Sequence, residues 1–443
     1  MERFWCGQTD LAPVGLFRIL FGLQLFNWFW QLYPYLTAFF TDDGLLTAES
    51  LGAMRPHDFT LLAFASQQWQ VHALWLLGLV AAVMLTIGYR TRLACVLSFV
   101  TVSLFVGREP LILDGSDFVF RSVPLWLAFT AAGDAFALDA VLRRRRGPGP
   151  SGRGPAFPVR VLELQVAWIY LASGIEKLAG SSWLDGTATS WIFQLTNTYA
   201  RPWAGSLASS AELVHLTTWS TLALELAFLP LVFLPVWFRA GRWLAIAAAA
   251  GLHLGILACM NVGNFPVVML SLLVLFLPLR TPTHERPLAR PSRISLEVTI
   301  VLGVLAIGAL GTAMPFVPGS GSRLLARAAL TQRWDMFAPD PTHSDGSLIA
   351  DGHLANGSTV RLMPGTADSF YSRWQKVGER APGIPAAEIG PMFCRAMQAL
   401  APAHEALDGL DLVYVERTVQ SAGALPVVAE RTLWSGSCIA NPD

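Results

Sequence analysis

Long apolar runs with few charged residues recur along most of this chain. A helix needs roughly 20 apolar residues to cross the hydrocarbon core of a bilayer. Charged residues make up 14% of the chain, well below the roughly 25% typical of a soluble domain. We therefore expect an all-α polytopic membrane bundle of about nine transmembrane helices. The expected spans are Leu11–Leu32, Val71–Gly88, Leu93–Val106, Ser122–Leu138, Val159–Lys177, Leu213–Leu234, Trp243–Met260, Phe265–Leu279 and Leu296–Ala313.

Arginines cluster in alternate loops between these spans, after the second, fourth, sixth and eighth. The clusters are Arg90 with Arg92, residues 143–146, Arg239 with Arg242, and residues 280–293. Cytoplasmic loops of membrane proteins carry an excess of Lys and Arg. The pattern predicts a multi-pass protein of the cytoplasmic (inner) membrane, with its N-terminus inside and its C-terminal region outside.

The composition changes after Ala313. In the remaining residues short apolar segments are separated by polar ones, as in a folded domain that faces water. We expect a multi-pass transmembrane domain over residues 1–314 and a small extracytoplasmic α+β domain over 315–443. The tail pattern predicts a hairpin (347–363), a helix (385–400) and two further strands (412–420 and 425–434). Cys394 and Cys438 either form a disulfide in an oxidising compartment or remain buried free thiols.

Two classes of partner are excluded by composition. The net charge is zero, so there is no electrostatic footprint for nucleic acid. The cysteines form no C-x-x-C pair, and no two histidines stand at a metal-binding spacing in the candidate site. We expect neither a nucleic-acid partner nor a metal.

Lys177 is the most unusual residue of the apolar regions. It stands in SGIEKLAGSSWLDG (173–186), and only it and Lys376 are lysines among the 31 Lys and Arg residues. A lysine at a helix end commonly extends its ammonium group to the lipid headgroups, but arginine would do this equally well. Unlike arginine, a desolvated lysine can become a neutral amine and act as a general base. We therefore name Lys177 as a candidate catalytic residue.

His253 lies in the outer half of the seventh span, at a depth in the membrane that can be reached from the region of Lys177. It is a second catalytic candidate, although a lone histidine on an alanine-rich helix is also typical of a hydrogen-bonded core residue. The unusual outer-loop residues are candidates for binding a substrate or quinone: Trp183, Asp185, Asp114, His215 and Asn264. The alternative for the aspartates is turn chemistry, and for Trp183 an interfacial position.

Arg18 and Glu225 are charges within apolar spans. An uncompensated charge at membrane depth is costly, so such residues usually pair. Counting along the first and sixth spans puts both at a similar depth, which predicts a structural ion pair.

Several of these motifs, in this order, resemble a known family. SGIEKLAGSSWLDGTATSWIF is similar to the segment of vitamin K-dependent gamma-carboxylases that carries the catalytic lysine, and His253 followed by Gly263 resembles their His…Gly-x-F helix. LFRILFG, YPYLTAFFTDDGLL and RWDMFAPDP resemble the broader bacterial family with the HTTM (horizontally transferred transmembrane) domain. The resemblance covers residues 11 to about 345.

The resemblance implies a cofactor and a reaction. In the carboxylases the lysine deprotonates vitamin K hydroquinone, which reacts with oxygen to give a strong base; this base removes a γ-proton from a glutamate, and the carbanion adds CO2. It implies that Lys177 is the general base, that reduced vitamin K or another hydroquinone is the cofactor, and that membrane lipid and an exported peptide or protein are partners. The alternatives are a non-carboxylating HTTM protein that binds or modifies a quinone or lipid, and a transporter.

Overall fold

The computed structural model describes most of the chain: residues 4–5, 7–54, 66–147, 149–278, 334–364, 373–398, 400–401, 406–420 and 425–438. The last expected span, Leu296–Ala313, lies outside the described residues. The arginine cluster of residues 280–293 lies outside them as well.

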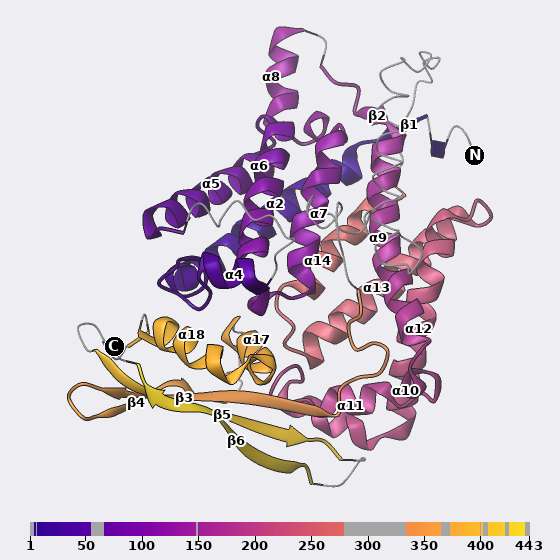
Figure 1. Cartoon of the computed structure of the whole chain (residues 1–443). Helices are drawn as coiled ribbons and strands as arrows, with labels where there is room; N and C mark the ends of the chain where they lie inside the picture. The colour runs from indigo at the N-terminus through magenta and orange to yellow at the C-terminus, as the bar shows by residue number, and fades with distance from the viewer. Residues whose placement is uncertain are drawn as a thin grey trace.

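Helices make up almost all of the described chain between residues 12 and 276 (Figure 1). They are α2 (Ala12–Leu32), α3 (Leu36–Phe40), α4 (Ala48–Met54), α5 (Gln68–Ile87), α6 (Thr91–Arg108), α7 (Gly115–Phe129), α8 (Leu138–Arg146), α9 (Ala156–Lys177), α10 (Ser181–Leu184), α11 (Ala188–Gln194), α12 (Ala211–Phe233), α13 (Phe238–Cys259) and α14 (Phe265–Leu272).

Within the described residues, five helical segments are long and apolar enough to cross a membrane: the run from α2 to α3, α5, α6, α12 and α13. The α9 helix has 22 residues but carries more charge, and α14 continues as a 3-10 turn to Phe276, which makes a shorter apolar helix. The structure therefore confirms a helical membrane bundle, whereas the count of about nine spans stays a prediction.

The fourth expected span, Ser122–Leu138, is placed wrongly. The helix there, α7, begins at Gly115 because Asp114 caps it, accepting a hydrogen bond from the Ser116 N–H at 2.7 Å. It ends at Phe129, and a separate α8 starts at Leu138. Hydropathy alone extends a span through the apolar connection, whereas the polar capping group fixes where the helix begins.

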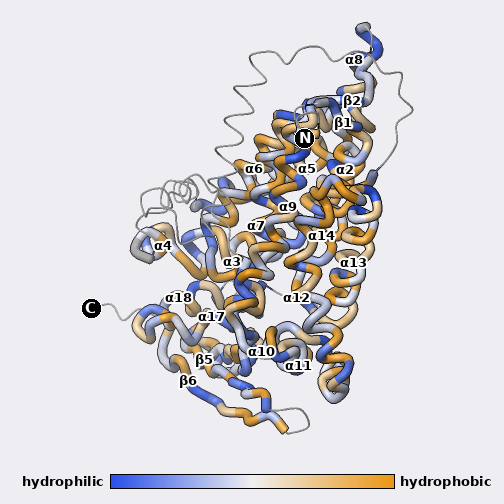
Figure 2. The backbone as a smooth tube through the Cα atoms, turned by 90° about the vertical axis from the view of Figure 1, so that its right-hand side faces the viewer, coloured by the Kyte–Doolittle hydropathy of each residue, from blue (hydrophilic) through white to orange (hydrophobic). Residues whose placement is uncertain are grey.

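The two sets of loops lie at opposite ends of the bundle. The strands β1 (Gln8–Asp10) and β2 (Arg153–Pro155) and the helix α8 lie at one end, and α10, α11 and the C-terminal sheet lie at the other (Figure 1). Apolar residues are concentrated in the helices between these ends (Figure 2). This separation fits the alternation of loops predicted from the arginines; which membrane and which orientation stay predictions.

The C-terminal region forms an antiparallel sheet of four strands in the order β4-β3-β5-β6. The strands are β3 (Ser344–Leu354), β4 (Thr359–Pro364), β5 (Leu407–Thr418) and β6 (Val427–Ser437). Helices α17 (Arg373–Arg380) and α18 (Ala386–Gln398) lie between this sheet and the bundle (Figure 1). The predicted hairpin, helix and two strands are confirmed, and α17 was not predicted. A disulfide joins Cys394 to Cys438.

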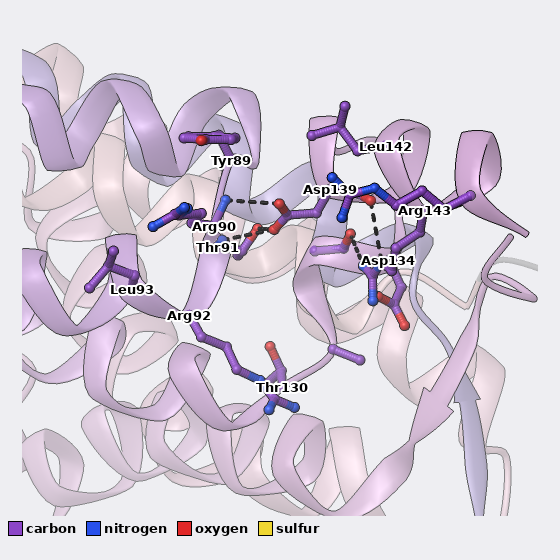
Figure 3. A pocket seen from close by; sticks show the side chains of 13 residues that line it. Tyr89, Arg90, Thr91, Arg92, Leu93, Thr130, Asp134, Asp139, Leu142 and Arg143 are labelled. Carbon is purple, nitrogen blue, oxygen red and sulfur yellow. Dashed lines mark hydrogen bonds and ion pairs between the residues drawn. The ribbon is translucent and has the colours of Figure 1, made fainter.

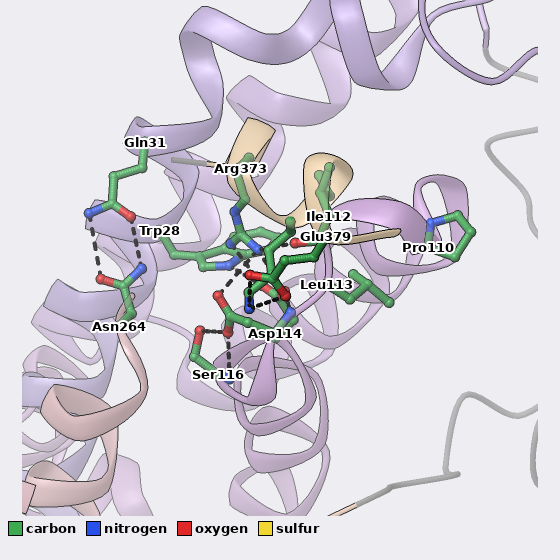
Figure 4. A network of polar contacts seen from close by, with 12 residues as sticks. Trp28, Gln31, Pro110, Ile112, Leu113, Asp114, Ser116, Asn264, Arg373 and Glu379 are labelled. Atoms are coloured by element: carbon green, nitrogen blue, oxygen red, sulfur yellow. Dashed lines mark hydrogen bonds and ion pairs between the residues drawn. The ribbon is translucent and has the colours of Figure 1, made fainter. Parts of the chain in front are cut away.

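A buried ion pair fastens α17 to the membrane bundle (Figure 4). The Arg373 guanidinium donates to both carboxylate oxygens of Asp117, at 2.7 and 2.9 Å, and the Trp28 indole N–H donates to the same carboxylate at 2.7 Å. Asp114 is 3.5 Å from the same guanidinium. The predicted loop residue Asp114 thus belongs to a helix cap and an interface between α7 and α17.

Arg18 is fully buried, but the predicted ion pair with Glu225 is wrong. Its guanidinium donates to the backbone carbonyls of Leu85 at 2.5 Å, Thr86 at 2.8 Å and Phe136 at 2.7 Å. The last carbonyls of a helix have no partner within that helix, and α5 ends beside Arg18 at Ile87. The charge therefore satisfies a helix C-terminus instead of meeting a carboxylate.

We expect Arg18→Met to lower the free energy of unfolding by about 3 kcal/mol, because several buried carbonyls lose a charged donor at once. The measurement is thermal unfolding of the detergent-purified protein. The matched control is Arg145→Met, which removes an exposed arginine of α8 and should change stability by less than about 0.5 kcal/mol. Equal stability of Arg18→Met and wild type would contradict this account.

Candidate functional site

Lys177 lies at the last residue of α9, and its side chain is only 3% exposed. Its ammonium group donates to the Ser173 hydroxyl at 2.5 Å and to Glu225 Oε1 at 3.0 Å. Ser173 precedes it by four residues, so both side chains lie on one face of α9. Lys177 therefore points into the bundle and does not extend to the headgroups, as a merely interfacial lysine would.

A glycine allows the carboxylate to reach the lysine. A Cβ atom added at Gly174 would lie 3.0 Å from the Leu226 side chain and 3.1 Å from that of Glu225. The missing side chain thus lets α9 and α12 approach closely, since a real Cβ rarely has such near neighbours. The sequence Ser173-Gly174 accordingly supplies both a hydroxyl for the ion pair and the space in which it forms.

Trp183, which sits on α10, covers the other side of the ammonium group. The Lys177 nitrogen lies 5.0 Å from the centre of the Trp183 ring, a cation–π distance. The indole N–H donates to the carbonyl oxygen of Phe337 at 2.8 Å. The chain then turns at Gly186, whose φ of +79° favours glycine. The turn that ends at Gly186 thus follows directly on the tryptophan that covers the lysine.

The segment after the undescribed residues 279–333 completes the site. Met336 and Phe337 line the same cavity as Lys177. Asp340 accepts hydrogen bonds from the backbone N–H groups of Ser181 at 3.2 Å and Ser182 at 2.8 Å. Partial burial raises the pKa of Asp340. These hydrogen bonds and the one from the Ser182 hydroxyl lower it by more, so the pKa lies below its ordinary value. Asp340 stays ionised and fixes the segment against α10.

A cavity of about 430 Å³ extends from the ion pair between α11, α12 and α13. Lys177, Glu225 and Trp183 lie in its lining, which is otherwise mainly apolar or small. On α13 the lining includes Gly251 and Gly255, which are exposed and where an added Cβ would meet nothing within 4 Å. The cavity is therefore a cleft that opens on the outer surface of the bundle, where the lipid would lie.

Glu225 lines this cleft, and one of its carboxylate oxygens has no hydrogen-bond partner among the described residues. Its Oε1 is bound to Lys177 and Ser173, whereas its Oε2 is buried and accepts no hydrogen bond within the described part of the chain. A buried carboxylate oxygen without a donor is unfavourable. It marks the position where a ligand with a hydroxyl group would be stabilised.

His253 lies beside the site but not in the cleft. It is 2% exposed, and its Nε2 is 2.7 Å from the hydroxyl of Tyr170. Tyr170 stacks on Phe228 with ring centres 4.2 Å apart. His253 thus occupies a packed position between α9, α12 and α13, as the core alternative anticipated. Its catalytic role stays a prediction.

The remaining candidates lie outside the cleft. Asp185 is exposed after α10, and His215 stacks on Trp219 with ring centres 5.0 Å apart. Asn264 exchanges hydrogen bonds with Gln31 (Figure 4). Among the predicted binding residues, the structure therefore brings only Trp183 to Lys177. Sequence reasoning missed Ser173, Met336 and Phe337, although the motif RWDMFAPDP contains the last two.

Residues 7–280 match the HTTM domain. The chain belongs to the HTTM family. It is similar to the Bacillus subtilis "Uncharacterized protein YitO", with 24% identity over 200 residues. This match covers 44% of the present chain and 63% of YitO, so the chain spans less than two thirds of that relative. No solved structure matches the HTTM chain significantly. Family and apolar helices together identify a multi-pass membrane protein.

We expect Lys177→Met to destabilise this HTTM protein by about 3 kcal/mol or more, because it leaves Glu225 as an unpaired buried charge. Adding Glu225→Gln should restore much of that loss, since the double variant has no charge to compensate. Thermal unfolding of the two single variants and the double variant measures the coupling. Purely additive losses would mean that the two side chains do not interact.

Proposed function

We propose that this HTTM protein is a membrane enzyme that binds a lipid-soluble hydroquinone in the cleft and removes its phenolic proton with the Lys177–Glu225 pair. The observation that supports this most directly is the cleft itself: apolar walls, an opening toward lipid, and a buried ion pair at its inner end. A hydroquinone has both features that such a site selects, an apolar body and an acidic hydroxyl group. Ligand sites are commonly apolar pockets with a few convergent polar groups.

The geometry modifies the role expected for Lys177. The Lys177 nitrogen already donates to Glu225 Oε1, 3.0 Å away. The free Oε2 of Glu225 is then the proton acceptor. The Lys177 ammonium group, held by Ser173 and Trp183, stabilises the negative charge that proton removal leaves. The base is thus the pair acting as a unit.

The resemblance to the vitamin K-dependent gamma-carboxylases suggests the subsequent chemistry. A bound hydroquinone, together with oxygen, would supply the strong base for carboxylation of a glutamate side chain by CO2. The end of the bundle that carries α10, α11 and the sheet is the end at which an exported peptide would meet the site (Figure 1). The second candidate, modification or binding of a lipid or quinone without carboxylation, is favoured by the lateral opening at Gly251 and Gly255.

We expect the purified protein to convert vitamin K hydroquinone and oxygen to the epoxide. Lys177→Gln and Glu225→Gln should each lower the rate at least ~100-fold, because the first removes the stabilising positive charge and the second removes the proton acceptor. Label from bicarbonate in a glutamate peptide would identify carboxylation. The matched control is Glu176→Gln, which changes the exposed neighbour of Lys177 and should leave the rate unchanged. Unaltered turnover in both site variants would eliminate the pair as the base; no turnover in any folded protein would favour the non-carboxylating candidate.

We expect Gly255→Leu to raise KM for the hydroquinone at least ~10-fold while the protein stays folded. Gly255 lines the cleft, and a Cβ atom added there has no neighbour within 4 Å. Leucine is also a better helix former than glycine by roughly 0.8 kcal/mol. Ala247→Leu is the control, since Ala247 is exposed on the same helix and does not line the cleft. If Gly255→Leu had the same KM as Ala247→Leu and wild type, the ligand would have to enter elsewhere.

A further inference from the structure

A second cavity, of about 630 Å³, lies beside α8 (Figure 3). This end of the bundle lies opposite to the end that carries α10 and α11 (Figure 1). The turn between α5 and α6 together with the first residues of α6 (Tyr89–Leu93) forms one wall, and α8 with the turn before it (Thr130–Arg146) forms the other. We propose that this cavity binds the phosphate headgroup of an anionic membrane lipid. This inference does not depend on the chemistry proposed for the cleft.

The lining carries an excess of positive charge. Four arginines line it, at positions 90, 92, 143 and 146, against two aspartates, Asp134 and Asp139. Both aspartates are already engaged. Asp139 accepts hydrogen bonds from the backbone N–H groups of Arg90 and Thr91 at 2.8 Å each, and Asp134 forms an ion pair with the Arg143 guanidinium.

Three guanidinium groups are therefore available to a ligand. In the described part of the chain, no carboxylate pairs with the guanidinium groups of Arg90, Arg92 or Arg146. Guanidinium groups bind phosphate through paired hydrogen bonds, and basic pockets between transmembrane helices bind anionic headgroups. The cavity therefore gathers the positive charge that a phosphate group requires.

Exposed apolar side chains on the segments that form the cavity walls favour a lipid over a soluble phosphate. Leu93 is 43% exposed, Phe136 63%, Leu138 37% and Val141 45%. Exposed apolar groups beside basic ones are typical of a segment at the membrane interface, where the former contact acyl chains. A soluble phosphate would use the arginines but leave these side chains in water. The expected membrane orientation places this end at the cytoplasmic leaflet, which carries anionic lipid.

The run Arg143–Arg146 provides a matched test. Arg146 lines the cavity, whereas Arg144 and Arg145 do not. A simple topology signal depends only on the number of charges, but a binding site depends on which arginines are kept. Arg92→Gln/Arg146→Gln and Arg144→Gln/Arg145→Gln remove the same charge from different places. Arg143 is left unchanged because it also donates to the Gly133 carbonyl.

The experiment is native mass spectrometry of the full chain in detergent, titrated with phosphatidylglycerol or phosphatidylcholine, with glycerol phosphate as a soluble competitor. We expect wild type and the Arg144/Arg145 double variant to bind phosphatidylglycerol equally and phosphatidylcholine weakly. The Arg92/Arg146 double variant should bind phosphatidylglycerol about tenfold more weakly. Equal losses in both double variants, or none in either, would overturn the site. Displacement by glycerol phosphate at comparable concentration would overturn the lipid as its ligand.

Discussion

A charge inside an apolar bundle must find its compensation within the protein, and this constraint determines much of the architecture. Three of the buried cations solve it in different ways. Lys177 takes a carboxylate, a hydroxyl and an aromatic face. Arg18 takes backbone carbonyls. Arg242 forms two bonds to Glu163, at 3.1 and 2.8 Å. These contacts join helices far apart in the sequence, so the charges also fix which helices become neighbours.

The two lysines of the chain share an environment although they lie in different regions. Lys376 on α17 is buried like Lys177, donates to Glu379 at 3.0 Å and lies 4.2 Å from the centre of the Tyr199 ring. Burial lowers the pKa of Lys376, but Glu379 and Tyr199 raise it more, so the amine stays protonated. The Tyr199 ring in turn contacts Phe337 edge-on, with centres 5.2 Å apart. A second buried lysine pair thus stands directly behind the wall of the cleft.

Sequence reasoning located the helices and Lys177 well, because hydropathy and amino-acid usage are local properties. The helix expected at Val159–Lys177 is observed at Ala156–Lys177. The partners were not predictable in the same way. Pairing of Lys177 with Glu225 depends on how closely α9 approaches α12 at Gly174. Counting residues along each span gives the depth of a residue in the membrane but not the distance between two helices. The contribution of Phe337 depends on a contact across 154 residues, from its carbonyl to Trp183.

The position of Phe337 in the chain also has a consequence for biogenesis. The cleft takes its helical walls from residues before 266, yet its closing side comes from the segment at Met336 and Phe337. A membrane helix is inserted as it is synthesised, so the helical walls are in the bilayer before that segment exists. During this interval Trp183 lacks its carbonyl partner and α10 lacks its Asp340 cap. The helices that carry Lys177 and Glu225 are therefore made before the segment that encloses them, and the cleft gains its closing side only when that later segment docks.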